Sequence, residues 1–451
     1  MDLLRGTLGL VGLLLLTLVL CSCNGYDASG QEVPCSGCNL VIISINTLRA
    51  DRVGVYGYSL NTTPYIDRFA KNSIVFENAY SLDTFTLPSA TTLFTSTYPQ
   101  YHGVTEWYLG MSDELPVLTE VLASAGYTTV GIAGDEALSP VYGFNRGFRR
   151  YYFAPENTTI VFSEIRKLRD KKFFLYIQLE HLHGLALEER DKYFMDAKCE
   201  DLQQIKLWYA YDRYKEEGGK AHIFDFYLNY SNTSYETKMH TINAFYDGKL
   251  KVVDEQFGGI IEALKDLNLL KNTIVVVTSD HGQALYEHDF VGHGGPFAYE
   301  ELVHVPLIMY IPGQKASKLS SYIQTIDIAP TVLDLLGIDI PREFQGKSFN
   351  DCLLYNFSCP SRCIYGKNYI ICDGWKLIYV SNETNYLYNL KEDPKESTNL
   401  APILTNLTSS LKSRFIKHKA FLKSEGPPEP KIIKIPPNIK TSLIKQGYWN
   451  K

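Results

Sequence analysis

The stretch NLVIISINTLRAD, residues 39–51, determines the class of fold. Residues 39–45 form a continuous apolar and β-branched run, which is typical of a strand buried on both faces of a parallel sheet. The polar residues Asn46, Arg49 and Asp51 follow directly. Open α/β sheets place their sites beyond the carboxyl ends of parallel strands, so this stretch predicts a buried strand that ends in a functional loop.

Two further apolar runs have the same form. Residues 173–179 (FFLYIQL) are followed by His183, and residues 273–278 (TIVVVT) are followed by Asp280 and His281. If the three strands lie in one sheet, the polar residues that follow them meet at one edge of that sheet. Such a cluster would make a metal or phosphate site.

Helical and hairpin patterns complete the predicted fold. Residues 246–267 repeat apolar residues at intervals of three and four, and Asn268 lies where such a helix would stop. Strand, helix and strand then follow one another with right-handed crossovers. After Gly346 the pattern changes to short strands with polar turns, which predicts a small antiparallel subdomain. The fold class is therefore α/β with a large, mostly parallel sheet and a small C-terminal α+β subdomain.

The composition is that of an ordinary globular protein. The chain has 451 residues, of which 45% are hydrophobic and 21% charged, and its formal net charge is −6. These values exclude the fibrous, coiled-coil and disordered classes. An overall pI near 6.0 indicates no basic stripe, so we expect no nucleic-acid partner.

The N-terminal residues predict export. Residues 6–20 are apolar and uncharged, and residues 20–23 (LCSC) resemble a lipoprotein box. We therefore expect a signal peptide over residues 1–22 and a lipid-anchored Cys23, with an uncleaved signal anchor or simple secretion as alternatives. All three place the bulk of the chain outside the cytoplasm.

The cysteines agree with export. After Cys23 the chain contains an odd number of them, so at least one is free or pairs elsewhere: Cys35, Cys38, Cys199, Cys352, Cys359, Cys363 and Cys372. The first two predict a local disulfide rather than a zinc site, because no second CxxC follows, and the last four predict a cross-linked loop. Sequons for surface glycosylation occur at Asn61, Asn157, Asn229, Asn232, Asn356, Asn382 and Asn406.

Several segments resemble the sulfatase family of the alkaline phosphatase superfamily. They include INTLRADRVGVYGY (45–58), TFTLPSATTLFTSTYPQYHGV (84–104) and GHGGPFAYEELVHVPLIMYIPG (292–313). The resemblance covers roughly residues 39–420 in family order and implies an alkaline-phosphatase-like sandwich of helices around the large sheet. The expected divisions are a tether over 23–38, a catalytic domain over 39–345 with an insertion at about 184–245, a C-terminal subdomain over 346–425 and a Pro/Lys tail over 426–451.

The resemblance also implies site residues. The family's nucleophile lies two positions before a Pro-Ser pair, which here makes it Thr86. The implied metal ligands are Asn46, Thr86, Asp280 and His281. His183 and His293 are implied to bind the anionic group or to protonate the leaving oxygen. For Arg49, substrate binding and a structural ion pair with Asp51 remain open alternatives.

Position 86 departs from the family pattern. Sulfatases carry Cys or Ser there, which is oxidised to formylglycine, and usually an Arg at the position of Ala90. Threonine cannot become this aldehyde because its β-carbon already holds a methyl, so no formylglycine is expected. A direct threonine nucleophile resembles the phosphodiesterase and phosphoglycerol or phosphoethanolamine transferase branches, which favours a phosphoester over a sulfate ester.

Asn46 is the second departure, because most relatives have Asp there. Its amide oxygen can bind a hard cation but adds no negative charge, so metal affinity should fall. With His281 among the ligands, one Mn²⁺ or Zn²⁺ is favoured and Ca²⁺ or Mg²⁺ is possible.

We therefore predict a metal-dependent hydrolase or transferase that cleaves phosphate or sulfate esters through Thr86. The alternatives are an arylsulfatase-like sulfuric ester hydrolase and a catalytically weak or inactive binding member. The expected partner is an anionic ester, whether glycan, lipid head group or small metabolite. Residues 214–222 and 229–236 of the insertion should decide specificity.

The sequence also contains a second, incomplete match to the formylglycine motif. Residues 359–362 (CPSR) imitate the formylglycine motif but lack the residue that the family places between Cys and Pro. We therefore interpret Cys359 and Cys363 as structural cysteines.

Overall fold

The structure is a computed structural model, and it describes residues 25–26, 32–33, 35–153, 158–183, 235–355, 359 and 362–445. The expected signal peptide, Cys23, Cys199 and the specificity segment 214–222 lie outside these residues, as do residues 229–234.

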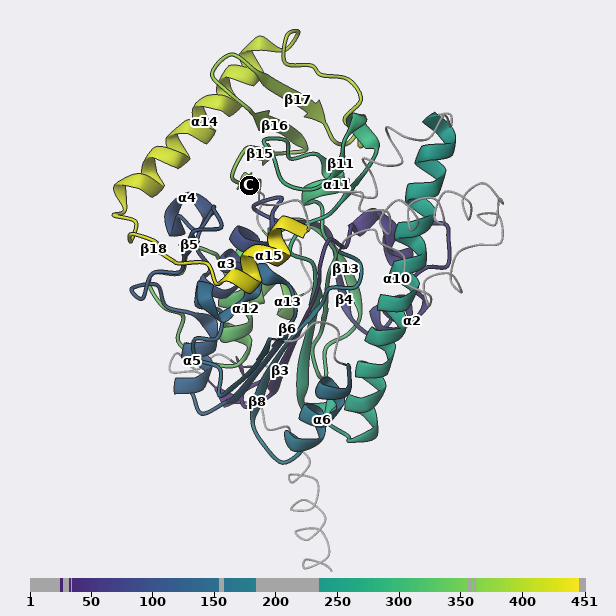
Figure 1. Cartoon of the computed structure of the whole chain (residues 1–451), viewed down its shortest axis with the longest axis vertical. Helices are drawn as coiled ribbons and strands as arrows, with labels where there is room; N and C mark the ends of the chain where they lie inside the picture. Colours follow the sequence, from purple (N-terminus) through teal and green to yellow (C-terminus); the bar gives the residue numbers. More distant parts are fainter. Residues whose placement is uncertain are drawn as a thin grey trace, which may run out of the picture.

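An eight-stranded sheet forms the centre of the molecule (Figure 1). Its strand order is β13 (Ser317–Gln324), β4 (Ile74–Tyr80), β12 (Leu307–Tyr310), β9 (Thr273–Thr278), β3 (Asn39–Ile45), β8 (Phe173–Leu179), β6 (Thr128–Ala133) and β7 (Arg150–Phe153). Every neighbouring pair is parallel except the two that β12 forms. The three strands predicted from apolar runs are β3, β8 and β9, and they are adjacent, which confirms the predicted fold class.

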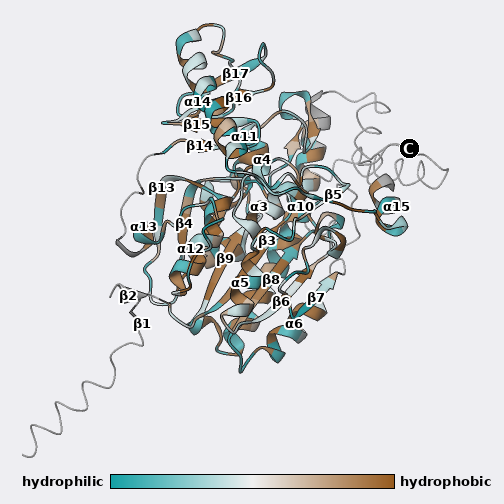
Figure 2. Cartoon of the chain, turned by 90° about the vertical axis from the view of Figure 1, so that its left-hand side faces the viewer, coloured by the Kyte–Doolittle hydropathy of each residue, from teal (hydrophilic) through white to brown (hydrophobic). Residues whose placement is uncertain are grey.

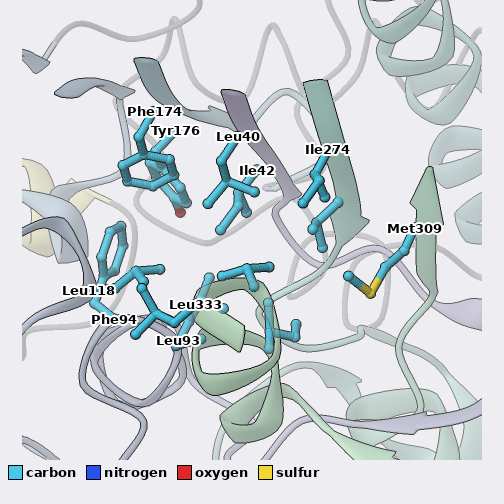
Figure 3. Close-up of a cluster of buried hydrophobic side chains, with 14 of the residues drawn as sticks. Leu40, Ile42, Leu93, Phe94, Leu118, Phe174, Tyr176, Ile274, Met309 and Leu333 are labelled. Atoms are coloured by element: carbon cyan, nitrogen blue, oxygen red, sulfur yellow. The ribbon is translucent and has the colours of Figure 1, made fainter. Parts of the chain in front are cut away.

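The central strands are buried on both faces because their side chains alternate between two cores. In β3, Leu40 and Ile42 enter one core, whereas Val41 and Ile43 enter the other. Figure 3 shows Leu40 and Ile42 facing Leu333 of a covering helix. Each such side chain contributes about 1.5–3 kcal/mol of transfer free energy. The hydropathy colouring of Figure 2 shows the same central strands as largely hydrophobic.

Helices cover both faces of the sheet. The first core includes side chains of α3 (Thr86–Thr95), α5 (Leu118–Ser124) and α12 (Ile328–Leu335). The second includes side chains of α2 (Pro64–Ala70), α6 (Thr158–Lys167) and α10 (Tyr235–Asp266). The predicted helix at 246–267 is the C-terminal part of α10, and Asn268 follows it with φ +58°. This left-handed conformation ends the helix where the sequence indicates.

The C-terminal subdomain is an antiparallel sheet covered by one long helix. Its strands are β14 (Ile364–Tyr365), β15 (Tyr369–Cys372), β16 (Trp375–Tyr379) and β17 (Asn385–Asn389). Ile370 packs against α14 (Thr405–Ser424), while Tyr369 and Ile371 face the catalytic domain. One face of the small sheet therefore attaches it to the large domain, and the other carries α14 at the outside of the molecule (Figure 1).

The segment expected as a Pro/Lys tail contains a strand and a helix. Strand β18 (Lys431–Ile432) pairs with β5 (Leu109–Gly110), and helix α15 (Pro437–Lys445) follows. Ile439 and Leu443 of α15 are buried. The spacing of four between these apolar residues places them on one face of the helix, which explains why α15 packs against the catalytic domain.

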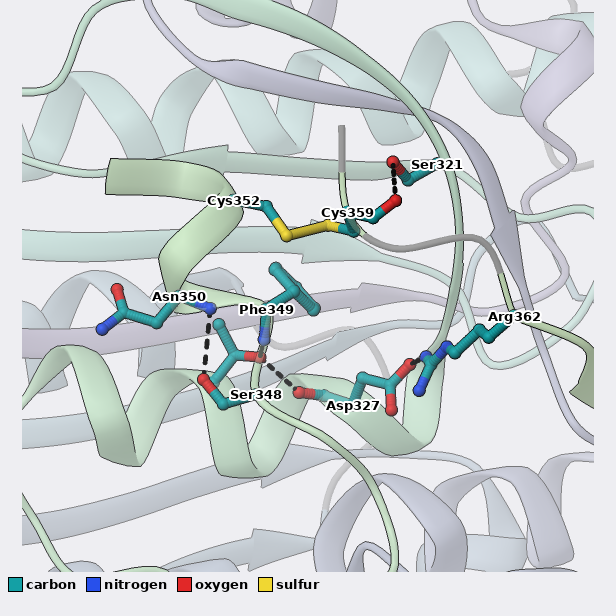
Figure 4. Close-up of a disulfide and its surroundings, with 9 residues drawn as sticks. Ser321, Asp327, Ser348, Phe349, Asn350, Cys352, Cys359 and Arg362 are labelled. Carbon is teal, nitrogen blue, oxygen red and sulfur yellow. Dashed lines mark hydrogen bonds and ion pairs between the residues drawn. A yellow bond between two sulfur atoms is a disulfide. The ribbon is translucent and has the colours of Figure 1, made fainter. Parts of the chain in front are cut away.

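Three disulfides cross-link the described chain. They join Cys35 to Cys38, Cys352 to Cys359 (Figure 4) and Cys363 to Cys372. Beside the second, Asp327 pairs with Arg362 and accepts a hydrogen bond from the backbone N–H of Lys347, which lies before α13 (Asn350–Tyr355). The local CxxC disulfide and the structural roles of Cys359 and Cys363 are thereby confirmed.

No helix in the described residues has both the length and the apolar character needed to cross a bilayer. The apolar residues 6–20 are outside that search.

Candidate active site

The loop after β3 is held against the loop after β9. Thr47 has φ +61°, an uncommon conformation for a β-branched residue. Its backbone N–H donates to Asp280 Oδ1 (3.1 Å), and the N–H of Leu48 donates to Ser279 Oγ (2.9 Å). The strained turn therefore aligns the two strand ends that the sequence indicated.

The two oxygens of Asp280 have different roles. Oδ1 accepts hydrogen bonds from the backbone of Thr47 (3.1 Å) and His281 (2.9 Å) and from the Ser279 hydroxyl (3.3 Å). Oδ2 is buried and accepts no hydrogen bond from the described residues, although it lies 3.5 Å from His281 Nε2. The first oxygen fixes the carboxylate, and the second is left for another electrophilic partner.

Asn46 is oriented by an aspartate that the sequence analysis did not identify. Its Nδ2 donates to Asp135 Oδ2 at 2.8 Å, which directs Oδ1 the opposite way. Asn46 Oδ1 is buried and has no hydrogen-bond partner among the described residues. Burial, with a further contribution from Asp280, raises the pKa of Asp135 to about 7. Asp135 follows the buried strand β6, so the strand-end pattern that identified Asn46 could also have identified it.

Thr86 is the first residue of α3 and is 2% exposed. Its Oγ1 lies 3.1 Å from His281 Nε2. His281 Nδ1 donates to the carbonyl of Gly282 at 2.9 Å, which leaves the lone pair on Nε2 facing Thr86. The threonine hydroxyl therefore lies next to an imidazole nitrogen that can accept a proton or bind a metal.

His183 and His293 complete the cluster. Their Nε2 atoms are 3.1 Å apart, so one proton is shared between the two rings. The His293 ring lies 4.4 Å from that of His281. Burial, followed by repulsion from the other two histidines, holds the pKa of His293 well below its usual range. The structure thus brings together three histidines predicted from distant segments.

The arrangement fits a metal ion bound mainly by oxygen. The two buried, orphaned oxygens belong to Asn46 and Asp280, and Nε2 of His281 contacts both Thr86 and Asp280. Within the described ranges, no group of three or more His, Cys, Asp or Glu side chains is placed to hold a metal. Of the four predicted ligands, only Asp280 and His281 are of these residue types, whereas Asn46 and Thr86 are neutral. The predicted ligand set therefore cannot form a group of three.

Arg49 is not brought to this cluster. Its side chain is 4% exposed and pairs with Asp51 (2.7 Å) and Glu287 (2.8 Å). It also donates to the carbonyl of Gln283 at 3.0 Å. Arg49 lines a separate cavity of about 1060 Å³, to which Thr86 and the three histidines do not contribute. Of the two alternatives for Arg49, the geometry favours the structural ion pair, because its guanidinium already contacts Asp51, Glu287 and the Gln283 carbonyl.

Ala90 faces inward. It is 3% exposed and lines a void of about 10 Å³ beside Ser44 and Asp280. A void of this size accommodates about one water molecule. The position where the family usually has Arg is therefore closed by the local packing.

A lysine of the C-terminal subdomain reaches the segment that precedes the nucleophile. Lys367, in the turn between β14 and β15, lies 3.1 Å from the buried carboxylate of Asp83. Its backbone N–H donates to the carbonyl of Leu82 at 2.7 Å. The subdomain therefore supports the loop that carries Thr86, a contact between residues too distant in sequence for any local pattern to reveal.

Two family profiles match this chain. The family profile described as Sulfatase matches residues 38–338, and that described as N-sulphoglucosamine sulphohydrolase, C-terminal, matches residues 287–420. Arylsulfatase K of Rattus norvegicus is 30% identical over 295 residues, which are 57% of this chain and 50% of the relative. The chain thus spans about half the length of that curated relative.

Two solved structures share the fold. A 2-O GAG sulfatase matches with a TM-score of 0.68 at 20% identity, covering 89% of this chain and 96% of its own. A phosphonate monoester hydrolase from Silicibacter pomeroyi matches with a TM-score of 0.68 at 17% identity, covering 85% of this chain and 95% of its own.

Proposed function

Since this chain belongs to the sulfatase family, we propose that it is a metal-dependent hydrolase that cleaves an anionic ester with Thr86 as its nucleophile. The observation that carries the proposal is the 3.1 Å contact between Thr86 Oγ1 and His281 Nε2. The buried orphaned oxygens of Asn46 and Asp280 support it, because they are suited to a divalent cation.

The proposed ligands are Asn46 Oδ1, Asp280 Oδ2, His281 Nε2 and Thr86 Oγ1. A bound divalent ion lowers the pKa of the hydroxyl that it touches and offsets the charge of the attacked group. Asp135 orients the Asn46 amide. A bound cation would favour the ionised form of Asp135, which would place negative charge next to a ligand that has none. That charge would compensate for the departure from Asp at position 46.

The proton movements involve the histidine pair and solvent. Thr86 releases its proton to solvent as Oγ1 bonds to phosphorus or sulfur, and the bond from that atom to the leaving oxygen breaks. The His183–His293 pair holds one proton between its Nε2 atoms and can give it to that oxygen. In the second step, water attacks the phosphorus or sulfur atom and gives one proton to the pair. The bond from that atom to Oγ1 breaks, and Oγ1 takes a proton from solvent to restore the Thr86 hydroxyl.

A phosphoester is the favoured substrate, because Thr86 cannot supply the second hydroxyl of a formylglycine hydrate. A sulfate ester is the second candidate, since the matched relatives include arylsulfatase K and a GAG sulfatase. The phosphonate monoester hydrolase match shows that this fold also serves phosphorus chemistry in a neighbour.

The test uses full-length protein with p-nitrophenyl phosphate, bis-p-nitrophenyl phosphate and p-nitrophenyl sulfate, each with Mn²⁺, Zn²⁺, Mg²⁺ or Ca²⁺. We expect Thr86→Ala to abolish turnover, whereas the exposed control Thr398→Ala retains it. Mass spectrometry of trapped enzyme should find phosphate or sulfate on Thr86. Full activity in Thr86→Ala would exclude the mechanism. Absence of turnover with every metal would favour the binding-member alternative.

We also propose that the protein is exported, with the lipid anchor at Cys23 as the favoured form. Three disulfides in the described residues support an oxidising compartment. Radiolabelled palmitate incorporation that is lost in Cys23→Ala would test the anchor.

A further inference from the structure

The strand registers place the amino ends of the parallel strands at one edge of the large sheet. Asn39 of β3 pairs with Thr273, the first residue of β9, and Met309 and Ser317 both pair with Ile74, the first residue of β4. The proposed active site lies at the opposite edge, where these strands end. We name the first edge the basal edge, and six segments connect the elements there: residues 35–38, 71–73, 125–127, 168–172, 267–272 and 311–316.

The basal edge is basic. Its six segments contain six Lys or Arg and one acidic residue, Asp170, a net charge of +5, whereas the whole chain carries −6. Among the described residues none of the six cations lies within ion-pair distance of a carboxylate, whereas Lys167 and Lys265 on the adjoining helices do so. The overall pI therefore conceals a basic surface, which corrects the expectation of no basic stripe. The six cations are all exposed, and they are Lys71, Arg169, Lys171, Lys172, Lys271 and Lys315.

These cations form a broad array. Lys315 precedes β13 and Lys172 precedes β8, and five strand-to-strand spacings separate these two strands in the sheet order. At about 4.8 Å per spacing, the array extends over about 24 Å. Lys71 and Lys271 lie between its ends, before β4 and β9. Such a distribution suits an extended anionic surface better than a single small anion.

The N-terminal segment enters the molecule at the basal edge. Cys38 immediately precedes β3 and is joined to Cys35 by a disulfide. Its Sγ lies 3.3 Å from Oδ1 of Asn272, the residue before β9. A membrane attachment upstream of Cys35 is therefore connected to this edge and not to the edge that contains Thr86.

The connection to that attachment is short. β1 (Gly25–Tyr26) pairs with β2 (Glu32–Val33), and the outermost residues of the two strands lie opposite each other. Fully extended, the twelve steps of chain from Cys23 to Cys35 would span about 40 Å. The pairing replaces eight of these steps with one strand-to-strand spacing of about 5 Å, and the other four add at most about 14 Å. The proposed anchor at Cys23 therefore lies within about 20 Å of the basal edge.

We propose that the basal edge rests on an anionic lipid surface, namely the membrane to which the N-terminus is attached. Lys and Arg side chains near such a surface are attracted to it, and the short tether keeps all six cations close to the head groups. A soluble polyanion would have to enter the narrow space between the protein and that membrane. The inference rests on the proposed N-terminal attachment, whether through the lipid or through an uncleaved signal anchor that ends at the same point.

Docking by the basal edge directs the proposed active site away from the bilayer. Asn46 follows Cys38 by eight residues of strand, which span about 26 Å. Figure 2 shows α5 and α6, which lead into the basal edge, at the end of the molecule opposite β15, β16 and β17. This orientation selects an ester in the surrounding medium over a lipid head group of the supporting membrane. That selection rests on the proposed function, whereas the docking surface does not.

The experiment compares two quadruple variants of the full-length protein, reconstituted into vesicles of phosphatidylcholine with or without phosphatidylglycerol. The test variant removes four cations of the basal edge: Lys71→Gln, Lys171→Gln, Lys271→Gln and Lys315→Gln. The matched control removes four exposed lysines of the C-terminal subdomain: Lys395→Gln, Lys417→Gln, Lys419→Gln and Lys423→Gln.

The reporter is Lys172, which both variants retain at the basal edge, and exposed Lys391 of the C-terminal subdomain is the internal reference. Mass spectrometry measures how fast a water-soluble acetylating reagent modifies each lysine on vesicles and in detergent. Turnover of the soluble p-nitrophenyl esters and head-group release from phosphatidylglycerol are recorded in parallel.

In wild-type protein and in the control, we expect acetylation of Lys172 to be at least about tenfold slower on vesicles with phosphatidylglycerol than in detergent, because the anionic surface covers this lysine. The rate at Lys391 should not change. The test variant should lose most of this protection, as should wild-type protein at high salt. Ester turnover should be equal in all three proteins, without head-group release.

Equal protection of Lys172 in wild-type protein and the test variant, or none in wild-type protein, would overturn the docking surface. So would protection by dextran sulfate in detergent without protection on anionic vesicles, which would assign the edge to a soluble polyanion. Head-group release from phosphatidylglycerol would overturn the orientation. If Lys172 is protected as expected but no ester is hydrolysed with any metal, the docking surface stands and the proposed function fails.

Discussion

Lys376 offers the sharpest test of how the two domains are held together. Its side chain is fully buried, with Nζ 2.9 Å from Glu300 Oε1 and 3.0 Å from Glu396 Oε1. The Glu396 side chain is also fully buried. Lys376→Met would leave two carboxylates without their cation, which typically destabilises a protein by about 3–5 kcal/mol.

The loss should depend on pH. Burial raises the pKa of Glu396 to about 7 even though Lys376 opposes the shift. Without Lys376 that pKa rises further, so the folded state of the variant binds more protons than the unfolded state over a wider range. Its stability therefore falls as pH rises through that range. We expect the loss of folding stability in the variant to be largest at pH 9. The loss should be smaller at pH 6, where the Glu396 side chain is neutral.

Guanidinium unfolding monitored by tryptophan fluorescence measures both effects, because Trp375 is adjacent in sequence. The double variant Lys376→Met with Glu396→Gln should recover at least half of the lost free energy, since it removes the unpaired charge. Exposed Lys391→Met is the control and should change stability by less than about 0.5 kcal/mol. A loss below about 1 kcal/mol at pH 9, or no recovery in the double variant, would refute the reasoning.

Three other predictions test the nucleophile region. Burial lowers the pKa of His102 to about 3. The histidine is therefore protonated below about pH 6.5 in the unfolded chain but stays neutral in the folded chain, so folding stability falls on acidification below that pH. His102→Asn should flatten this dependence in unfolding titrations between pH 6.5 and 4; an unchanged slope contradicts it. Asp135→Asn should weaken Mn²⁺ or Zn²⁺ affinity about 10- to 100-fold by calorimetry, through loss of Asn46 orientation, while circular dichroism stays unchanged. Gly282→Ala should abolish turnover or folding because its Cβ would collide with the Glu301 carbonyl, and an active, stable variant would disprove this.

The strands and the main site motifs could be predicted because they are local. A continuous run such as residues 39–45 is compatible only with burial on both faces, and the observed β3 has those bounds. Thr86, Asp280 and His281 lie in segments whose motifs resemble the family. The polar residues that follow the predicted strands meet because the carboxyl ends of parallel strands lie at one edge of the sheet. The family resemblance implies roles for these three residues, and the geometry of the site is compatible with those roles.

What the sequence by itself determined, then, was the α/β class, the family and most of the residues that surround Thr86. The tertiary structure decided how their polar atoms are satisfied. Asp135 contacts Asn46 across 89 residues of chain, and Arg49 contacts Glu287 across 238. The physical reason is that hydrophobic periodicity is encoded residue by residue. The pairing of a buried charge or amide depends instead on which distant loop the sheet order brings beside it.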